Sequence, residues 1–288
     1  MTEIAVQLPY LSMPLVDTFD AWLTGTLGRF VPPLTFTEVR KGVQALSSLY
    51  VERRGEGRLA TRAIEGAGKR AALATYYAAI HFLTAHHALR MIEKERLGPV
   101  RRVVDLGCGT GAVGAAVGAT LSGVREVVGC DRSGWALEEA ERTWAAFGLK
   151  GRTMREDLPG AVPRGGPGSL LVFGWSASEL GEEELAGLLR RIIGALRKGS
   201  TLFLLEPLST RVTPWWETWR STLAPHRVQE ELIRVAIDRP GFVRDMDKAA
   251  RLDHQVIGAR LLYGGARVGR AEAGPEAVGE PEAEDAED

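Results

Sequence analysis

A glycine-rich segment, Val103-Val-Asp-Leu-Gly-Cys-Gly-Thr-Gly111, follows a short apolar run and precedes a stretch of Ala, Val and Gly that is typical of a buried helix. Glycines between a strand and a helix allow a sharp turn and let a ligand approach the backbone N–H groups. The segment also contains Gly109-x-Gly111-x-x-Gly114, and Asp131 lies about 20 residues further on, as in the dinucleotide fingerprint. A nucleotide-binding dehydrogenase is therefore the first interpretation to test.

The position of Asp105 separates that interpretation from others. If Gly109 were the first glycine of the fingerprint, Asp105 would lie inside a buried parallel strand, where an unpaired carboxylate is costly or protonated. If the turn begins at Gly107, Asp105 lies at the carboxyl end of the strand, where α/β sheets bind ligands. A carboxylate there can help to fix the amino-acid part of a cationic ligand. We therefore expect the Asp105 side chain at an exposed strand tip.

The segment closely resembles motif I of the class I S-adenosylmethionine-dependent methyltransferases, and the resemblance covers roughly residues 100–206. It implies S-adenosylmethionine as the cofactor, with Asp131 at the ribose hydroxyls. It also implies that Asp157 contacts the adenine amino group, although Glu156 could take that role. The expected cofactor-binding residues are Asp105, Leu106, Gly107, Cys108, Gly109, Gly111, Asp131, Arg132, Asp157 and Trp175.

The segment Phe173-Gly-Trp-Ser-Ala-Ser-Glu-Leu180 occupies the place where members of this superfamily carry residues that face the methyl acceptor. It is not an Asn-Pro-Pro-Tyr type motif, and no cysteine follows it, which argues against methylation of adenine or glutamine amino groups and of cytosine C5. Trp175 could stack on adenine or substrate, or pack in the core. Glu179 could orient or deprotonate an acceptor, or complement a helix dipole. Because methyl transfer depends mainly on alignment, we assign no catalytic residue.

Histidines and tryptophans elsewhere are interpreted as structural. His81, His86 and His87 lie in an apolar helix and are expected to pack or to form structural hydrogen bonds. His226 and His254 lie in the C-terminal third and receive no role. The tryptophans at 215, 216 and 219 are interpreted either as a lid over the site or as core residues.

The order of elements predicts a doubly wound, Rossmann-like α/β sheet behind an N-terminal helical subdomain. The stretch 71–89 lacks charged residues, but it is rich in alanine and contains three histidines, so we expect a buried helix and no membrane span. The expected units are helices over 1–98, the methyltransferase domain over 99–267 and a disordered acidic tail over 268–288. The expected strands cover 102–105, 126–130, 152–155, 169–174 and 201–206, with a last strand over 254–263 at the sheet edge.

Charge and cysteine content limit the partners. The last 18 residues carry eight acidic side chains and no basic ones, which leaves 36 basic and 29 acidic residues in the body of the chain. That mild excess of positive charge would tolerate RNA. The two cysteines have no metal-ligand spacing, so no metal is expected. The N-terminal residues show no basic region ahead of an apolar stretch, which indicates a cytoplasmic protein.

A weaker resemblance concerns the whole layout. The segments Ala45–Tyr50, Tyr76–Ile80 and Ser178-Glu-Leu180 are similar to those of small-ribosomal-subunit assembly methyltransferase-like proteins. This resemblance implies an rRNA or ribosomal partner. Members of that family commonly carry a cysteine cluster after the fifth strand, and this sequence has none, so no iron–sulfur site is expected. The alternatives to an rRNA-directed methyltransferase are a small-molecule methyltransferase and a non-catalytic assembly factor that binds S-adenosylmethionine.

Overall fold

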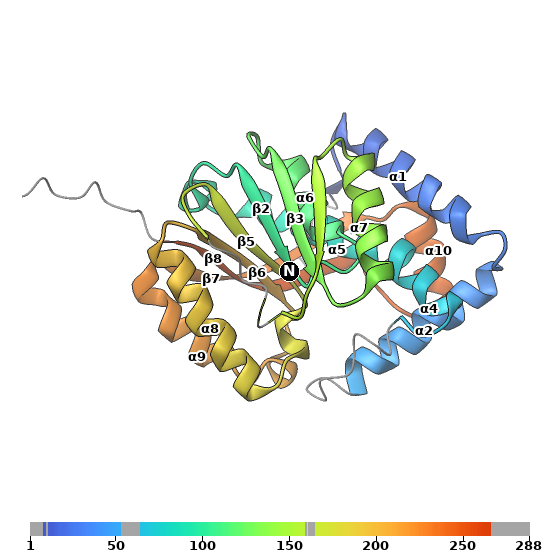
Figure 1. Cartoon of the computed structure of the whole chain (residues 1–288). Coiled ribbons are helices and arrows are strands. Elements are labelled where there is room, and N and C mark those ends of the chain that lie inside the picture. Colours follow the sequence, from blue (N-terminus) through green and yellow to red (C-terminus); the bar gives the residue numbers. More distant parts are fainter. Residues whose placement is uncertain (1–7, 10, 53–63, 159, 161–164, 266–288) are drawn as a thin grey trace, which may run out of the picture.

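A computed structural model describes residues 8–9, 11–52, 64–158, 160 and 165–265. The predicted acidic tail, residues 268–288, lies outside the described residues, and the division of the chain at residue 98 stays a prediction. Figure 1 shows a single twisted sheet between layers of helices. The predicted doubly wound α/β architecture with helices at its N-terminal side is confirmed.

The strand order is β1-β7-β8-β6-β5-β2-β3-β4, and β8 runs antiparallel to both of its neighbours. The strands are β1 (Leu8–Pro9), β2 (Arg102–Leu106), β3 (Glu126–Asp131), β4 (Gly151–Arg155), β5 (Ser169–Gly174), β6 (Thr201–Glu206), β7 (Val228–Asp238) and β8 (Val256–Gly264). The five parallel strands β2 to β6 lie within one residue of the predicted bounds. The dinucleotide-binding Rossmann sheet is built mostly of parallel strands in two βαβαβ halves, and the antiparallel β8, inserted between β6 and β7, departs from that arrangement.

Helices cover both faces of the sheet (Figure 1). The α-helices are α1 (Leu15–Phe30), α2 (Phe36–Glu52), α4 (Ala67–Ala72), α5 (Ala78–Met91), α6 (Ala112–Thr120), α7 (Gly134–Ala146), α8 (Glu182–Arg197), α9 (Trp216–Leu223) and α10 (Gly241–Ala250). Successive strand residues face opposite layers: Val103 packs among α5 and α6, whereas Val104 packs beneath α8 and α9. This alternation explains why the strands are apolar on both faces.

The apolar stretch 71–89 runs through the interior, as predicted. It contains the end of α4, one π-helical turn (Leu73–Tyr77) and most of α5, and nearly all its residues are buried. A π turn shifts the helix register by one residue and is often found at functional sites. Among the described residues, no helix is both long and apolar enough to cross a membrane.

In the C-terminal third, the position predicted for the last strand is wrong and one strand was missed. The strand predicted at the sheet edge over 254–263 is β8, which lies inside the sheet between β6 and β7. Strand β7, which lies between β1 and β8, was missed because its polar sequence, Val-Gln-Glu-Glu-Leu-Ile-Arg, reflects one solvent-facing side, on which Leu232 is 61% exposed. Trp216 and Trp219 belong to α9 and are almost fully buried in the core, which confirms the interpretation of these tryptophans as core residues.

A buried ion pair fastens α10 to the end of β7. Arg239 Nη1 lies 2.6 Å from Asp247 Oδ2, and the two side chains are 11% and 1% exposed. Removing one partner of such a pair leaves an uncompensated charge in the interior.

We therefore expect Arg239→Ala to lower the free energy of unfolding by about 3–5 kcal/mol in urea titrations. The control is Arg220→Ala, which removes an exposed arginine paired with Glu217 and should change stability little. Equal effects of the two substitutions would contradict this account.

Candidate functional site

One cavity of about 490 Å³ lies at the carboxyl ends of the parallel strands, at the lower edge of the sheet in Figure 1. Its first wall comes from the segments that follow β2, β3 and β4. Its second wall comes from the π turn, α5 and the segment that leads into β8. The cavity is therefore built by parts of the chain that lie far apart in the sequence.

The glycine-rich turn begins at Gly107, as predicted. Gly107, Gly109 and Gly111 all have positive φ angles, which L-residues with a side chain rarely adopt. A Cβ atom on Gly107 would lie 2.6 Å from Ser176 Cβ, whereas one on Gly109 would meet nothing within 4 Å. Gly109 is thus the position where the backbone of the turn is open to a ligand.

Trp144 of α7 holds the far end of the turn. Its indole Nε1 donates a 2.9 Å hydrogen bond to the carbonyl of Gly111, and the ring is fully buried. A Cβ atom on Gly111 would come within 2.9 Å of Ala140 and Trp144. Gly111 therefore serves close packing and does not border the cavity, in contrast to the expected ligand contact.

Asp105 borders the cavity, but its side chain is not exposed. It is the penultimate residue of β2 and only 1% exposed, so the expectation of an exposed strand tip is wrong. The reason is the start of α6: the N–H of Gly114 donates a 3.0 Å hydrogen bond to Asp105 Oδ2 and covers the strand end. Burial raises the pKa of the Asp105 carboxyl to about 7.

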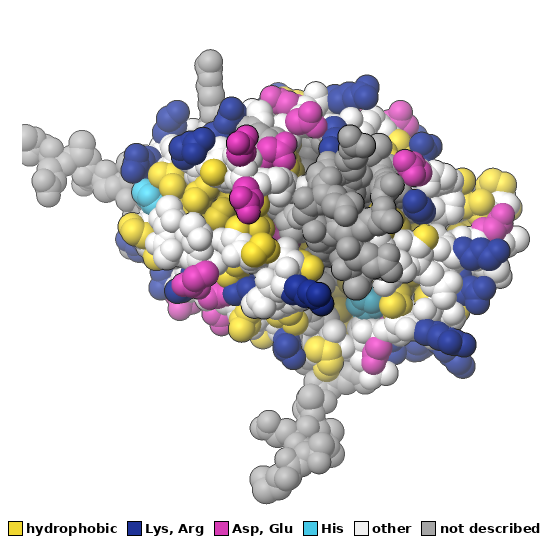
Figure 2. All heavy atoms as spheres, turned by 90° about the horizontal axis from the view of Figure 1, so that it is seen from below, with side chains coloured by type: hydrophobic (Ala, Val, Ile, Leu, Met, Phe, Trp, Pro, Cys, Tyr) yellow, Lys and Arg dark blue, Asp and Glu magenta, His cyan; other side chains and the backbone are white. Residues whose placement is uncertain are grey.

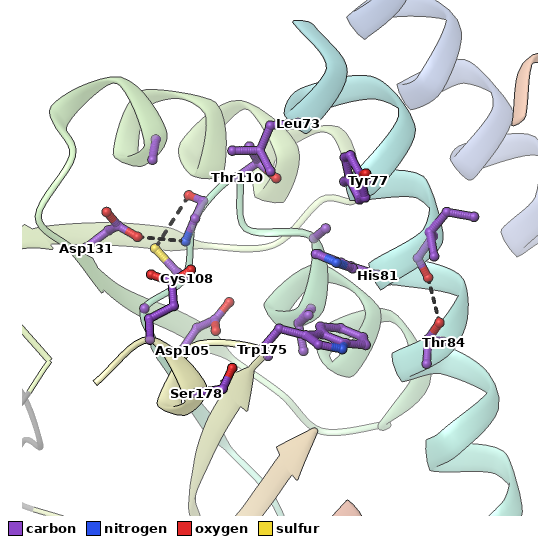
Figure 3. Close-up of a pocket in the computed structure, with 18 of the residues that line it drawn as sticks. Leu73, Tyr77, His81, Thr84, Asp105, Cys108, Thr110, Asp131, Trp175 and Ser178 are labelled. Atoms are coloured by element: carbon purple, nitrogen blue, oxygen red, sulfur yellow. Dashed lines mark hydrogen bonds between the residues drawn. The ribbon is translucent and has the colours of Figure 1, made fainter. Parts of the chain in front are cut away.

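Asp131 at the end of β3 ties two backbone segments together. Its Oδ2 accepts the N–H of Gly109 at 3.0 Å, and its Oδ1 accepts the N–H of Ser133 at 2.8 Å. Figure 3 shows this carboxylate at the side of the cavity formed by the glycine-rich turn. Burial raises its pKa although both hydrogen bonds oppose the shift. The Asp131 carboxylate therefore fixes the backbone at Gly109 and also borders the cavity.

The remaining expected residues divide into two groups. The residues of the first group border the cavity: Cys108, Arg132 and Asp157. Glu156 borders it too, so both acidic residues considered for the adenine amino group lie at the cavity. Leu106 does not border it: this side chain is fully buried beneath α8, and its carbonyl accepts the hydroxyl of Ser176 at 2.8 Å.

Trp175 lies in the second half of the cavity. It has a φ of 57°, an unusual value for a bulky residue, and its N–H donates to the carbonyl of Leu205 at 2.9 Å. Its indole stacks on the ring of His81, with centroids 4.2 Å apart and planes 14° apart. In Figure 3 this pair lies well away from Asp131, which places Trp175 with the second wall.

Sequence reasoning missed the polar residues of the second wall. Tyr77, His81 and Thr84 are spaced by four and three residues along one helix and border the cavity together. His254, which received no role, borders it too. The available signal was this one-sided stripe of polar and aromatic residues in an otherwise alanine-rich segment. Among the described residues, no group of three or more metal-ligating side chains is arranged for an ion.

The buried carboxyl of Asp105 makes stability depend on pH. Its pKa is about 7 in the folded chain against 3.8 for an unburied carboxyl, so the folded state binds more protons between these values. The free energy of unfolding should therefore fall as the pH rises through that window.

We expect Asp105→Asn to be stabilising at pH 8 and to lose roughly 2–3 kcal/mol of that advantage by pH 5. Chemical denaturation of both proteins at a series of pH values measures this difference. Asp238→Asn, at an exposed position, is the control. A stability difference that is independent of pH would show that Asp105 is already ionised in the fold.

The search of curated proteins returns no match. Among solved structures, the mitomycin 7-O-methyltransferase MmcR is 14% identical, with a TM-score of 0.48 and coverage of 89% of this chain and 70% of that chain. The N-methyltransferase NodS of Bradyrhizobium japonicum, solved with S-adenosylhomocysteine, is 14% identical, with a TM-score of 0.44 and coverage of 63% and 86%. A Pyrococcus horikoshii protein described as a putative RNA methyltransferase is 13% identical, with a TM-score of 0.42 and coverage of 81% and 100%.

Residues 85–166 match the family model of the methyltransferase small domain. The matched residues contain the glycine-rich turn, Asp105 and Asp131, and they end after β4. The predicted enzyme class and cofactor agree with this match. Residues 85–166 of the chain are therefore similar to a methyltransferase small domain.

Proposed function

We propose that the cavity binds S-adenosylmethionine against its first wall and a small-molecule acceptor against its second wall. The observation that carries this proposal is the continuity of the cavity from the carboxylates around the glycine-rich turn to the Trp175–His81 pair. A volume of about 490 Å³ is in the range of sites that enclose small ligands.

The residues of the first wall fit a cationic, ribose-containing ligand. Gly109 leaves its backbone open, and Asp131 presents a fixed carboxylate that can accept hydrogen bonds from ribose hydroxyls. Either Asp157 or Glu156 can accept a hydrogen bond from an adenine amino group. S-adenosylmethionine supplies a methyl group carried on a positively charged sulfur.

The second wall orients the acceptor and excludes water. Leu73, Ile80 and Ile257 supply apolar surface, and Trp175 with His81 supplies a flat aromatic one. Because alignment of the reacting atoms provides much of the acceleration in methyl transfer, this shaped wall can act without a dedicated acid or base.

Asp131→Ala should weaken the binding of S-adenosylhomocysteine by about 10- to 100-fold in calorimetric titrations, because it removes charged hydrogen bonds to the ribose. Asp238→Ala, which removes an exposed carboxylate outside the cavity, should leave the affinity unchanged. Titration with a nicotinamide dinucleotide is the second control. Binding of the dinucleotide in preference to S-adenosylhomocysteine would overturn the proposed function.

The second candidate is a methyltransferase directed to rRNA or the small ribosomal subunit in the cytoplasm. It is favoured by the excess of 36 basic over 29 acidic residues outside the acidic tail and by the layout of the chain. Figure 2 shows the edge where the parallel strands end, and basic and acidic side chains are interspersed over its described part. That mixture fits a small-molecule site better than a track for a phosphate backbone.

Filter binding to rRNA at several salt concentrations tests the second candidate. An RNA-directed enzyme should lose affinity steeply as salt rises, since each phosphate contact releases counterions. For the small-molecule enzyme we expect weak binding at low salt that does not discriminate between rRNA and an unrelated RNA.

A further inference from the structure

A buried polar cluster lies directly behind the second wall of the cavity. Asp247 of α10 is 1% exposed and accepts hydrogen bonds from the hydroxyl of Tyr76, from His254 Nδ1 at 2.9 Å and from Arg239 Nη1 at 2.6 Å. The Tyr76 oxygen also lies 2.8 Å from His254 Nδ1. His254 is the member of this cluster that borders the cavity.

The hydrogen bonds fix which nitrogen of His254 carries the proton. Burial raises the pKa of Asp247, but the hydrogen bonds from His254, Tyr76 and Arg239 outweigh it and hold the pKa below its ordinary value, so the carboxylate only accepts. Burial and the carboxylate raise the pKa of Tyr76, which therefore stays a donor to Asp247. The proton between the ring and Asp247 must then reside on Nδ1.

In the neutral ring, this tautomer leaves His254 Nε2 with an unshared electron pair. Nδ1 faces the buried cluster, and Nε2 takes no part in the hydrogen bonds of that cluster. His254 borders the cavity, so Nε2 is the ring nitrogen left for a bound acceptor. An Asp–His pair of this kind holds the imidazole in the correct tautomer and stabilises the imidazolium that forms when the ring takes up a proton.

Other residues of the same wall favour a flat acceptor. The stacked rings of Trp175 and His81 offer an aromatic face, and Tyr77, from the same π turn as Tyr76, also borders the cavity. Aromatic side chains bind planar rings by offset stacking. The unusual φ of Trp175 indicates that the fold tolerates strain to place this indole.

The geometry points to His254 as the general base that deprotonates an aromatic hydroxyl acceptor, with Asp247 and Tyr76 as positioning residues. This assignment rests on the proposed function and names its acceptor class. The hydroxyl proton passes to Nε2 while an oxygen electron pair forms the new O–CH₃ bond. The S–CH₃ bond breaks with its electron pair left on sulfur, which becomes neutral, and water later removes the proton from His254.

The test uses 4-nitrophenol, whose ionised form absorbs visible light while its neutral form does not. At a pH where the free probe is mostly neutral, we expect binding to the wild-type protein to produce the phenolate signal, because Nε2 takes the proton. His254→Gln should lose the signal. His226→Gln, which removes a histidine outside the cavity, should keep it. Binding without ionisation, no binding, or an unchanged signal in His254→Gln would each overturn the assignment.

Asp247→Asn tests the positioning role separately. An asparagine amide can donate to Nδ1 and so favours the tautomer with the ring proton on Nε2, which weakens the base without removing the histidine. We expect 4-nitrophenol still to bind, with about a 10-fold lower ratio of phenolate to phenol, which corresponds to one pKa unit. If binding weakens but this ratio is unchanged, the aspartate is structural only.

Calorimetry with S-adenosylhomocysteine separates this assignment from the proposed function. All the variants should bind it like the wild type, because none of these residues lies at the first wall, and normal binding also shows that each variant is folded. Binding of S-adenosylhomocysteine without probe ionisation overturns the role of His254 alone. Probe ionisation without such binding overturns the proposed function, and the methyl-transfer step falls with it.

Discussion

The β2–α6 turn depends on a carboxylate that the fold places inside the protein. Asp105, the penultimate residue of β2, lies beneath the start of α6 and accepts the N–H of Gly114, so one buried hydrogen bond fixes where the helix begins. Trp144 secures the other side of the turn at Gly111. With both ends held, Gly109 is the part of the turn whose backbone has open space beside it, and Asp131 determines its orientation. The shape of the first wall at this turn thus follows from the way in which β2 is connected to α6.

The second half of the cavity has a different origin. Its wall combines the π turn and α5 with the segment before β8, which the antiparallel β8 brings back into the middle of the sheet. The same path of the chain places α10 behind the second wall. There Asp247 of α10 forms hydrogen bonds with Tyr76 and His254. The position of β8 therefore matters for chemistry as well as for topology, because it joins the two ends of the chain at one site.

The sequence predicted the half of the site that is local. Strand, turn and helix from Val103 to Gly114 and Asp131 are neighbours in a βαβ unit, so their spacing alone brings them together. The burial of Asp105 was not predictable, since it depends on the angle at which α6 starts. His81 and His254 were underestimated because their roles arise from contacts between residues more than 90 positions apart in the chain, with Trp175 and Tyr76 respectively. Strand β7 was missed because its exposed face resembles a loop.

The two halves explain why the acceptor is harder to infer than the cofactor. A nucleotide-like ligand needs an open glycine and fixed carboxylates, which many α/β enzymes build at the same strand ends. The acceptor is selected by the second wall, which is formed by other parts of the chain. In this protein that wall contains apolar helices, a stacked Trp–His pair and a histidine held by a buried aspartate. Such a wall recognises a ring and can remove a proton, whereas recognition of a polyanion needs exposed cations along an open surface. The chemistry of the second wall is therefore the stronger guide to the substrate than the overall charge of the chain.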